Sequence, residues 1–254
     1  MSSIPLIKAL TEAGMGSRRR LADAIRQGRV KINGKVAEDF RHPVNVEKDK
    51  VLVNGRLADL KSRKAVYLML NKPRGILSTT SDERGRRTVM DILPEIYRRL
   101  RLYPVGRLDK NSTGLLLLTN DGGFTYQLTH PKFGHEKVYL VLLDKRLHPG
   151  GRQKLEQGIE LEDGMTYPAI VREVEALPSF SYSITIHEGR KRQVRRMFES
   201  LGYRVMALKR IRIGSLSLGD LKEGEMRELR VKEAQSLLNS KPVLRENTVT
   251  AKSF

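Results

Sequence analysis

The chain has 254 residues, 39% of them hydrophobic, which is enough for a small module followed by a larger body with its own core. Lysine and arginine total 48 against 29 aspartate and glutamate, a formal net charge of +19 that indicates a polyanionic partner, above all nucleic acid. The absence of cysteine excludes disulfides, thiolate metal ligands and a cysteine nucleophile. No apolar run is long enough to span a bilayer, and we therefore expect a cytoplasmic protein.

Residues 1–60 have the pattern of a small separate module. Apolar side chains recur at helical spacing in two short stretches, Leu6, Leu10 and Ala13 and then Leu21, Ala24 and Ile25. Ser17 is suited to cap the second helix. Asn33-Gly34 and Asn54-Gly55 each follow a short β-type run and favour tight hairpin turns, because both residues tolerate positive φ. Two helices and a hairpin are therefore predicted.

A run of three arginines opens the second helix of this module. Arg18, Arg19 and Arg20 lie in its first turn, where the helix dipole disfavours cations. A phosphate held by these arginines and by the helix amides would compensate, although a solvated basic face is the alternative. We predict that the three arginines bind RNA together with Arg29 and Lys31 of the hairpin.

The segment SRRRLADAIRQGRVKINGKV, residues 17–36, resembles the small RNA-binding domain named after ribosomal small-subunit protein four. The resemblance covers residues 4–55 and implies that the two helices and the hairpin cradle structured RNA. This domain occurs in several RNA enzymes, so it does not decide the chemistry.

The remainder of the chain predicts a larger α+β domain over residues 61–240. Strands are expected at residues 65–70, 114–118, 138–143 and 182–186, and helices at residues 121–128 and between Gly189 and Gly202. The elements do not alternate strictly, which favours a mixed, largely antiparallel sheet flanked by helices. Residues 241–254 are polar and aperiodic, and we expect a loosely ordered tail.

Asp109 is an acid in a basic loop that lies between two apolar segments. A carboxylate placed where nucleic acid binds would repel phosphate, so Asp109 is better explained by reaction chemistry than by binding. An Asx turn is the structural alternative. Ser112 and Thr113 lie nearby, but they have no histidine base to activate them.

A second basic segment, IHEGRKRQVRRMFESLGYRVMALKRIRIG, covers residues 186–214. Helical spacing predicts that Arg192 and Arg195 project alike beside the core, whereas Arg196 points elsewhere. A core-adjacent arginine needs an anion, and Asp109 could be that partner. The other basic residues that we assign to RNA binding in this domain are Lys72, Arg74, Arg107, Arg190, Arg192 and Arg196.

Three motifs together resemble the ribosomal RNA pseudouridine synthases of the small-subunit synthase A and large-subunit synthase B, E and F group. They are GRLDKNSTGLLLLTNDG, KVYLV and GRKRQVRRM, in a match that spans residues 67–229. The resemblance implies the pseudouridine synthase fold, Asp109 as the catalytic aspartate and Tyr139 as the aromatic residue that packs on the target uracil. It also implies that Arg195, or alternatively Arg192, orients the carboxylate. An ordinary core residue is the other interpretation of Tyr139.

The function that this resemblance implies is isomerisation of uridine to pseudouridine in ribosomal RNA, without metal or cofactor. RIRIGSLSLGDLKEGEMREL, residues 210–229, is most similar to the large-subunit synthase B branch, so we expect a 23S rRNA substrate and a monomeric enzyme. A 16S rRNA substrate is the alternative. A non-catalytic RNA-binding or assembly factor is the alternative of another class. A nuclease or glycosidase would need a metal cluster or paired carboxylates, and Asp109 has no acidic neighbour in sequence.

Overall fold

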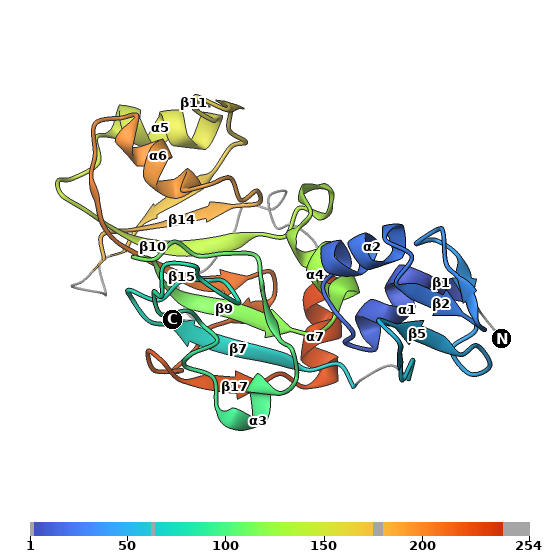
Figure 1. The fold of residues 1–254 in the computed structure, drawn as a ribbon. Coiled ribbons are helices and arrows are strands. Elements are labelled where there is room, and N and C mark those ends of the chain that lie inside the picture. Colours follow the sequence, from blue (N-terminus) through green and yellow to red (C-terminus); the bar gives the residue numbers. More distant parts are fainter. Residues whose placement is uncertain (1–2, 62–63, 175–179, 241–254) are drawn as a thin grey trace. The chain divides into compact units, whose positions relative to one another are not determined.

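The computed structural model describes residues 3–61, 64–174 and 180–240 (Figure 1). The predicted tail, residues 241–254, and part of the predicted connector, residues 62–63, lie outside the described residues. The chain forms two compact units, residues 1–65 with 120–122 and residues 66–119 with 123–254. Within the described residues, every helix is too short or too polar to span a bilayer.

The first unit contains two helices and short antiparallel strands, as predicted. Its helices are α1 (Leu6–Glu12) and α2 (Arg18–Arg26), and its strands are β1 (Ile4–Pro5), β2 (Val30–Ile32), β3 (Lys35–Val36), β4 (Pro43–Val44), β5 (Val51–Val53) and β6 (Arg56–Leu57). Ser17 Oγ accepts a hydrogen bond of 3.3 Å from the Arg20 amide, which confirms the predicted N-cap. Asn33 and Gly34 have φ values of 48° and 86°, as a tight hairpin turn requires.

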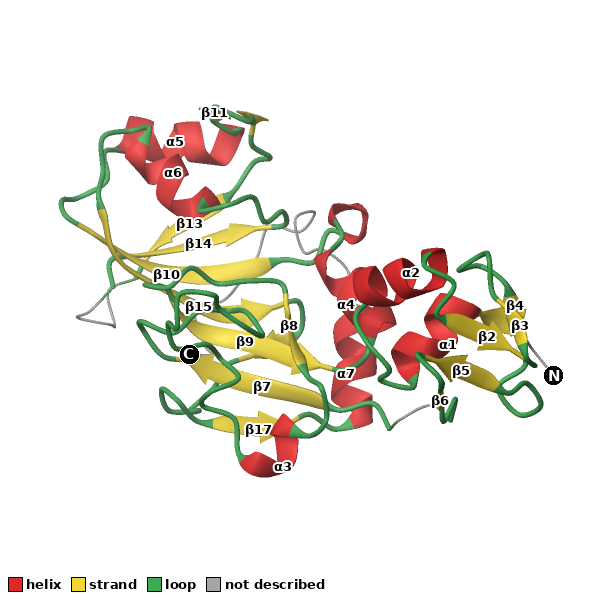
Figure 2. Ribbon diagram, in the orientation of Figure 1, coloured by secondary structure: helices red, strands yellow, loops and turns green. Residues whose placement is uncertain are grey.

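In the part of the chain that the structure describes, the second unit is built on a nine-stranded sheet (Figure 2). Its main path runs in the order β13, β14, β10, β15, β9, β7, β17, and every pair is antiparallel except β9 with β15. The strands on this path are β7 (Tyr67–Lys72), β9 (Thr113–Thr119), β10 (Lys137–Leu143), β13 (Ile170–Glu173), β14 (Tyr182–Ile186), β15 (Val205–Ile213) and β17 (Met226–Glu228). The predicted α+β class with a largely antiparallel sheet is confirmed.

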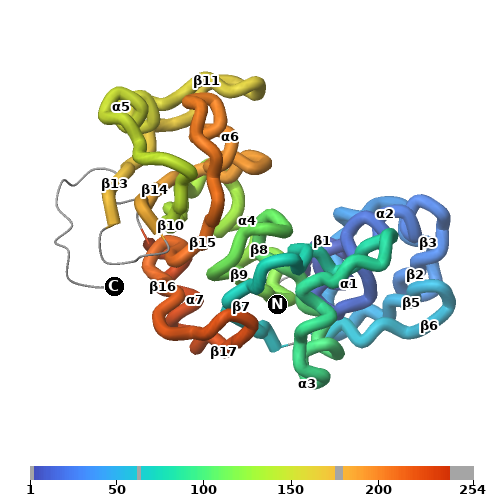
Figure 3. The backbone as a smooth tube through the Cα atoms, turned by 90° about the vertical axis from the view of Figure 1, so that its left-hand side faces the viewer, coloured from blue at the N-terminus to red at the C-terminus, as the bar shows by residue number. Residues whose placement is uncertain are grey.

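Shorter elements surround this sheet. Strands β8 (Tyr103–Val105) and β16 (Leu216–Ser217) pair with β9 and β15, and β11 (Glu160–Leu161) and β12 (Gly164–Met165) form a separate hairpin. The helices are α3 (Glu95–Arg98), α4 (Gly122–Thr129), α5 (Pro149–Gln157), α6 (Gln193–Glu199) and α7 (Val231–Leu238), with a 3-10 turn, η1 (Pro131–Phe133). Figure 3 shows α5 and α6 beside the end of the sheet that carries β13 and β14.

Both faces of the central strands are buried, because alternate residues join different cores. Leu116 and Leu118 of β9 belong to a core that includes Phe198 of α6. Leu115 and Leu117 point to the opposite face, where α4 and α7 provide the apolar cover. A strand sealed on both faces is a rigid support for the loop that precedes it.

The loop that carries Asp109 depends on a close approach of two backbones. It connects β8 to β9, and Gly114 follows it at the point where β9 runs parallel to β15. Gly114 has a φ of 99°, and a Cβ atom there would collide with the backbone of Arg210. Only glycine therefore allows β15 to lie against the start of β9.

Candidate active site

The backbone around Asp109 is held by hydrogen bonds on several sides. The Ser112 amide donates to the Asp109 carbonyl oxygen at 3.0 Å, which closes a turn. Ser78 Oγ donates to the Leu108 carbonyl at 2.9 Å, and the Gly75 amide donates to the Lys110 carbonyl at 2.8 Å. The carboxylate at the tip of this fixed loop is still 30% exposed. The Asp109 carboxylate is thus presented by a backbone that is fixed on several sides.

Lys72 lies beneath this loop and is not available to RNA, which corrects its predicted role. Its side chain is 0% exposed, and Nζ donates to the carbonyls of Pro73, Lys110 and Ser112 at 2.8, 3.3 and 2.9 Å. Burial lowers the pKa of Lys72 to about 8, against the opposing effect of Glu223 and Asp109. Lys72 is therefore a support for the Asp109 loop.

Arg195 and Asp109 form the predicted pair. Nε of Arg195 lies 3.9 Å from Oδ2 of Asp109, within ion-pair range but too far for a hydrogen bond. Arg195 is 7% exposed, and its Nη1 donates to the Val205 carbonyl at 2.8 Å. Burial and the nearby positive charge of Arg192 lower the pKa of Arg195, and the negative charge of Asp109 opposes this shift. The guanidinium nevertheless stays charged at any physiological pH.

The Asp109 carboxylate does not form an Asx turn in this structure. Among the hydrogen bonds of the described residues, none runs from a backbone amide to this carboxylate, and its ion-pair partner is Arg195. Both carboxylate oxygens therefore remain open to accept from, or react with, a bound molecule.

Arg192 does not project with Arg195, so this part of the helical prediction was wrong. Helix α6 begins at Gln193, and Arg192 precedes it with a left-handed φ of 53°. Its exposed guanidinium pairs with Glu199 at 3.3 Å. The helical spacing of three residues does not apply to a residue that lies outside the helix.

A pocket of about 360 Å³ opens beside this pair, and both Asp109 and Tyr139 line it. Tyr139 lies in β10 and is 8% exposed, so most of its ring is covered while part of it faces the pocket. The Tyr139 hydroxyl accepts a long hydrogen bond of 3.4 Å from Nη1 of Arg210. The structure thus brings the predicted aspartate and the predicted aromatic residue to one hollow.

Three further cations, Lys137, Lys191 and Arg210, line the pocket and were not predicted as site residues. Lys137 lies two positions before Tyr139 in β10, and burial lowers its pKa to about 8, an effect that Arg210 strengthens and Glu188 opposes. Arg210 is 4% exposed and donates Nε to the Leu115 carbonyl at 2.8 Å, whereas its buried Nη2 has no hydrogen-bond partner among the described residues. The two-residue strand period from Tyr139 could have revealed Lys137. Arg210 reaches the site only through the pairing of β15 with β10.

Arg190 holds the wall of the pocket together, and we no longer assign it to RNA. Its Nε donates to Glu188 at 3.0 Å, Nη1 to the Gly164 carbonyl at 2.7 Å and Nη2 to the Met165 carbonyl at 2.6 Å. The guanidinium therefore ties the β11–β12 hairpin to the segment that precedes α6. Every one of its nitrogens has a partner within the chain.

Arg196 is likewise engaged inside the protein. Its two terminal nitrogens bind the two carboxylate oxygens of Asp163, each at 2.9 Å. This bidentate pair raises the pKa of Arg196 and lowers that of Asp163. The prediction that Arg196 binds RNA is corrected accordingly.

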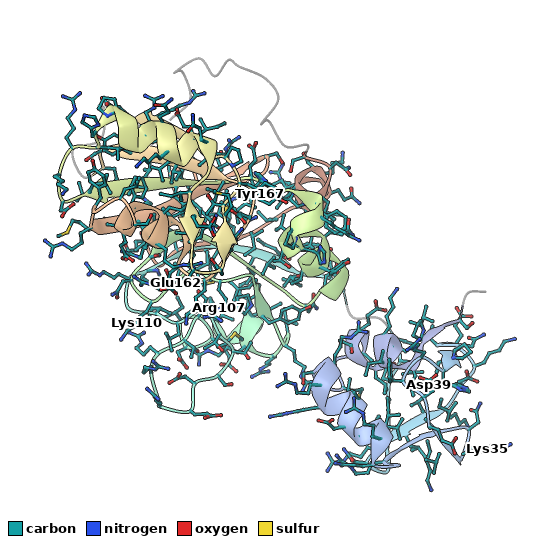
Figure 4. The ribbon with its side chains drawn as sticks, turned by 90° about the horizontal axis from the view of Figure 1, so that it is seen from above. Lys35, Asp39, Arg107, Lys110, Glu162 and Tyr167 are labelled. Carbon is teal, nitrogen blue, oxygen red and sulfur yellow. The ribbon has the colours of Figure 1, made fainter. Side chains whose placement is uncertain are left out.

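The other predicted RNA-binding residues lie at the surface. Arg18, Arg19, Arg20 and Lys31 are exposed on the first unit, where Arg29 donates to Asn54 at 2.8 Å. On the second unit Arg74 and Arg107 are exposed, and Arg107 also lines the pocket. Figure 4 shows Arg107 and Lys110, the two basic side chains on either side of the Asp109 position in the chain.

The fold consists of a small two-helix unit and an α+β unit with an acid-bearing pocket, and comparison with known proteins specifies the family. Residues 66–200 match the RNA pseudouridylate synthase family, and residues 4–49 match the S4 domain. The chain belongs to the RNA pseudouridylate synthase family and carries an N-terminal S4 domain, which confirms the resemblance seen in the sequence.

Relatives of this chain match it over nearly its whole length. Ribosomal large subunit pseudouridine synthase B of Bacillus subtilis is 42% identical over 91% of this chain and 94% of its own. An uncharacterized RNA pseudouridine synthase of Aquifex aeolicus is 39% identical over 94% of this chain and 96% of its own. A crystal structure of a pseudouridylate synthase, 35% identical, covers 92% of this chain and all of that chain, with a TM-score of 0.66.

Proposed function

We propose that this protein isomerises uridine to pseudouridine in ribosomal RNA and that its substrate is the 23S rRNA of the large subunit. The observation that carries the proposal is the Asp109 carboxylate, paired with the buried Arg195 and lining one pocket with Tyr139. The name of the Bacillus subtilis relative and the sequence of residues 210–229 support the large subunit. A 16S rRNA substrate is the competing choice.

In this proposal the target uridine leaves its helix or loop and enters the pocket. Extruding a base costs a few kcal/mol, and stacking on the Tyr139 ring returns roughly 1–3 kcal/mol. Lys137 and Nη2 of Arg210, which has no partner among the described residues, offer hydrogen-bond donors to the oxygen atoms of the bound nucleotide. In this proposal Tyr139 provides the aromatic surface of the pocket, while Lys137 and Arg210 provide polar contacts.

Asp109 must be ionised to act on the ribose. It can attack the anomeric carbon, or it can remove a proton and promote a glycal route. In the first route Asp109 displaces uracil N1 and forms an ester with the anomeric carbon, and this ester breaks when carbon 5 of the turned base bonds to that carbon. In the second route Asp109 takes the C2′ proton of the ribose as the base leaves and returns it when carbon 5 bonds to the anomeric carbon. In both routes carbon 5 loses its proton and N1 gains one. Arg195 favours the charged form of Asp109 and is itself held by the Val205 carbonyl, so the pair is oriented before substrate binds.

The pocket also has to exclude water during this exchange. A water molecule that reached the ribose carbon would hydrolyse the nucleoside before the base could rejoin. The nearly complete burial of Arg195, Arg210 and Tyr139 is consistent with a site that a bound nucleotide closes. We also propose that the enzyme works as a cytoplasmic monomer, since Asp109, Arg195 and Tyr139 all come from the same chain and its substrate is ribosomal RNA.

The Asp109→Asn variant tests this proposal. We expect no pseudouridine from this variant in a tritium-release assay on rRNA labelled at uracil carbon 5, with RNA affinity close to that of the unaltered protein. Asp220→Asn, a change at an exposed aspartate, is the matched control and should keep full activity. Pseudouridine formation by Asp109→Asn would refute the catalytic assignment and would favour the alternative of a non-catalytic RNA-binding factor.

The choice of ribosomal subunit needs a separate experiment. Pseudouridine can be mapped in 23S and 16S rRNA from cells that lack this gene and from cells complemented with Asp109→Asn. Loss of one 23S pseudouridine in both strains is the expected result. Loss of a 16S pseudouridine would support the competing substrate.

A further inference from the structure

A group of aromatic and basic side chains lies on α4 and η1, next to the pocket but not inside it. The rings of Tyr126 and His130 are 4.9 Å apart, and those of Tyr126 and Phe133 are 5.8 Å apart in an edge-to-face arrangement. Lys132 Nζ lies 5.1 Å from the Tyr126 ring and 4.7 Å from the Phe133 ring. We call these four residues the aromatic platform.

The aromatic platform is a surface feature, not an extension of the core. Tyr126 is 48% exposed, and His130 and Lys132 are exposed as well. A single exposed ring needs no explanation, but three adjacent rings with a cation among them form a mixed apolar and positive surface. Such a surface is suited to a ligand that combines flat aromatic groups with negative charge.

The platform is continuous with the wall of the pocket. Leu128 and Thr129, which lie between Tyr126 and His130 in the chain, both line the pocket. Lys137, another lining residue, donates a hydrogen bond of 2.7 Å to the carbonyl of His135, just beyond η1. A polymer with one residue in the pocket would therefore place its neighbouring residues near these rings.

We propose that the aromatic platform stacks an unpaired RNA base next to the target uridine. This proposal rests on the proposed function, because RNA is taken to be the polymer in the pocket. Bases stack on aromatic side chains whatever their sequence, because every base has a π face. The contact of Lys132 with the two rings is weak at an exposed site, so its ammonium can move to a phosphate when a base takes its place.

The absence of tryptophan from the chain gives a local probe of this surface. Tyr126→Trp places a single tryptophan on the platform, and Tyr167→Trp is the matched control. Tyr167 is 58% exposed in the same unit, and its ring lies 4.6 Å from that of His187. The RNA is a short strand of alternating cytidine and adenosine with one central uridine, which cannot pair with itself.

We expect this single strand to quench the tryptophan emission of Tyr126→Trp and to leave that of Tyr167→Trp unchanged. We also expect Tyr126→Ala to weaken binding of the strand by about 5- to 100-fold, with less effect on its fully paired duplex. Unchanged emission of Tyr126→Trp, or equal quenching in both variants, would overturn the proposal. If Tyr126→Trp does not fold, unchanged affinity of Tyr126→Ala has the same meaning.

A parallel pseudouridine assay separates this inference from the proposed function. Quenching at position 126 by a protein that forms no pseudouridine on any rRNA would refute the proposed function and keep the platform. Pseudouridine formation without quenching would refute the platform and keep the proposed function.

Discussion

Nε of Arg195 and Oδ2 of Asp109 lie 3.9 Å apart, although the two residues come from a helix and a loop that are distant in sequence. The Arg195 guanidinium reaches this position with Nη1 donating to the Val205 carbonyl and Nη2 at 3.5 Å from the Asn111 carbonyl. One side chain thus connects the Asp109 loop, α6 and β15. We therefore propose that Arg195 positions the carboxylate.

Arg195→Met should lower kcat by about 100-fold with little change in RNA affinity, because a pre-oriented charge is lost from the reaction and not from the binding surface. Single-turnover kinetics and filter binding measure the two quantities. Arg152→Met, which removes a surface pair with Glu156 on α5, is the control and should leave both unchanged. A loss of affinity with normal kcat in Arg195→Met would place Arg195 in RNA binding instead.

Lys72→Met should destabilise the protein by about 3 kcal/mol, because three carbonyl oxygens lose a buried donor. We also expect a lower kcat, since two of those carbonyls belong to the loop of Asp109, and unchanged RNA affinity, since the ammonium is buried. Urea denaturation, a pseudouridine rate assay and RNA titration test the three parts. Weaker RNA binding by a stably folded Lys72→Met would restore the role predicted from the sequence.

Activity should fall as the pH rises through about 8. Burial lowers the pKa of Lys137 and of Lys72 to about 8, so each charge is present below that pH and is lost above it, where an ordinary lysine would remain charged. We expect single-turnover rates to fall roughly tenfold per pH unit above this value. Lys137→Arg keeps a positive charge in the pocket, so the decrease in rate should move to higher pH. If the decrease stays at the same pH in this variant, we would assign it to Lys72.

The arginines at the start of α2 should determine much of the salt dependence of RNA binding. Changing Arg18, Arg19 and Arg20 to Gln should weaken binding to all RNA sequences and reduce the slope of log affinity against log salt by up to about 2 to 3. Arg26→Gln on the same helix is the control, because Arg26 already pairs with Asp23 at 2.8 Å. An unchanged slope in the triple variant would support the alternative of a solvated basic face.

The elements that depend on local conformation could be predicted from the sequence. Ser17 caps α2 because its hydroxyl reaches an amide within the same turn, and Asn33-Gly34 turns because both residues accept positive φ. β7 ends at Lys72, directly before Pro73, which has no amide hydrogen to continue the ladder. Asp109 could also be selected as a candidate from the sequence, because an acidic residue in a basic loop needs no tertiary contact to be recognised.

The roles of the cations were decided only by the tertiary structure. Composition predicted that Lys72, Arg190 and Arg196 bind RNA, but each meets oxygen acceptors of this chain, most of them remote in sequence. Helical spacing predicted that Arg192 and Arg195 project in the same direction, but the left-handed backbone at Arg192 places it outside α6. A positive charge is a property of one residue, whereas the partner of that charge depends on which segments the fold brings together. A local sequence pattern does not reveal which distant residues will lie close to the charge.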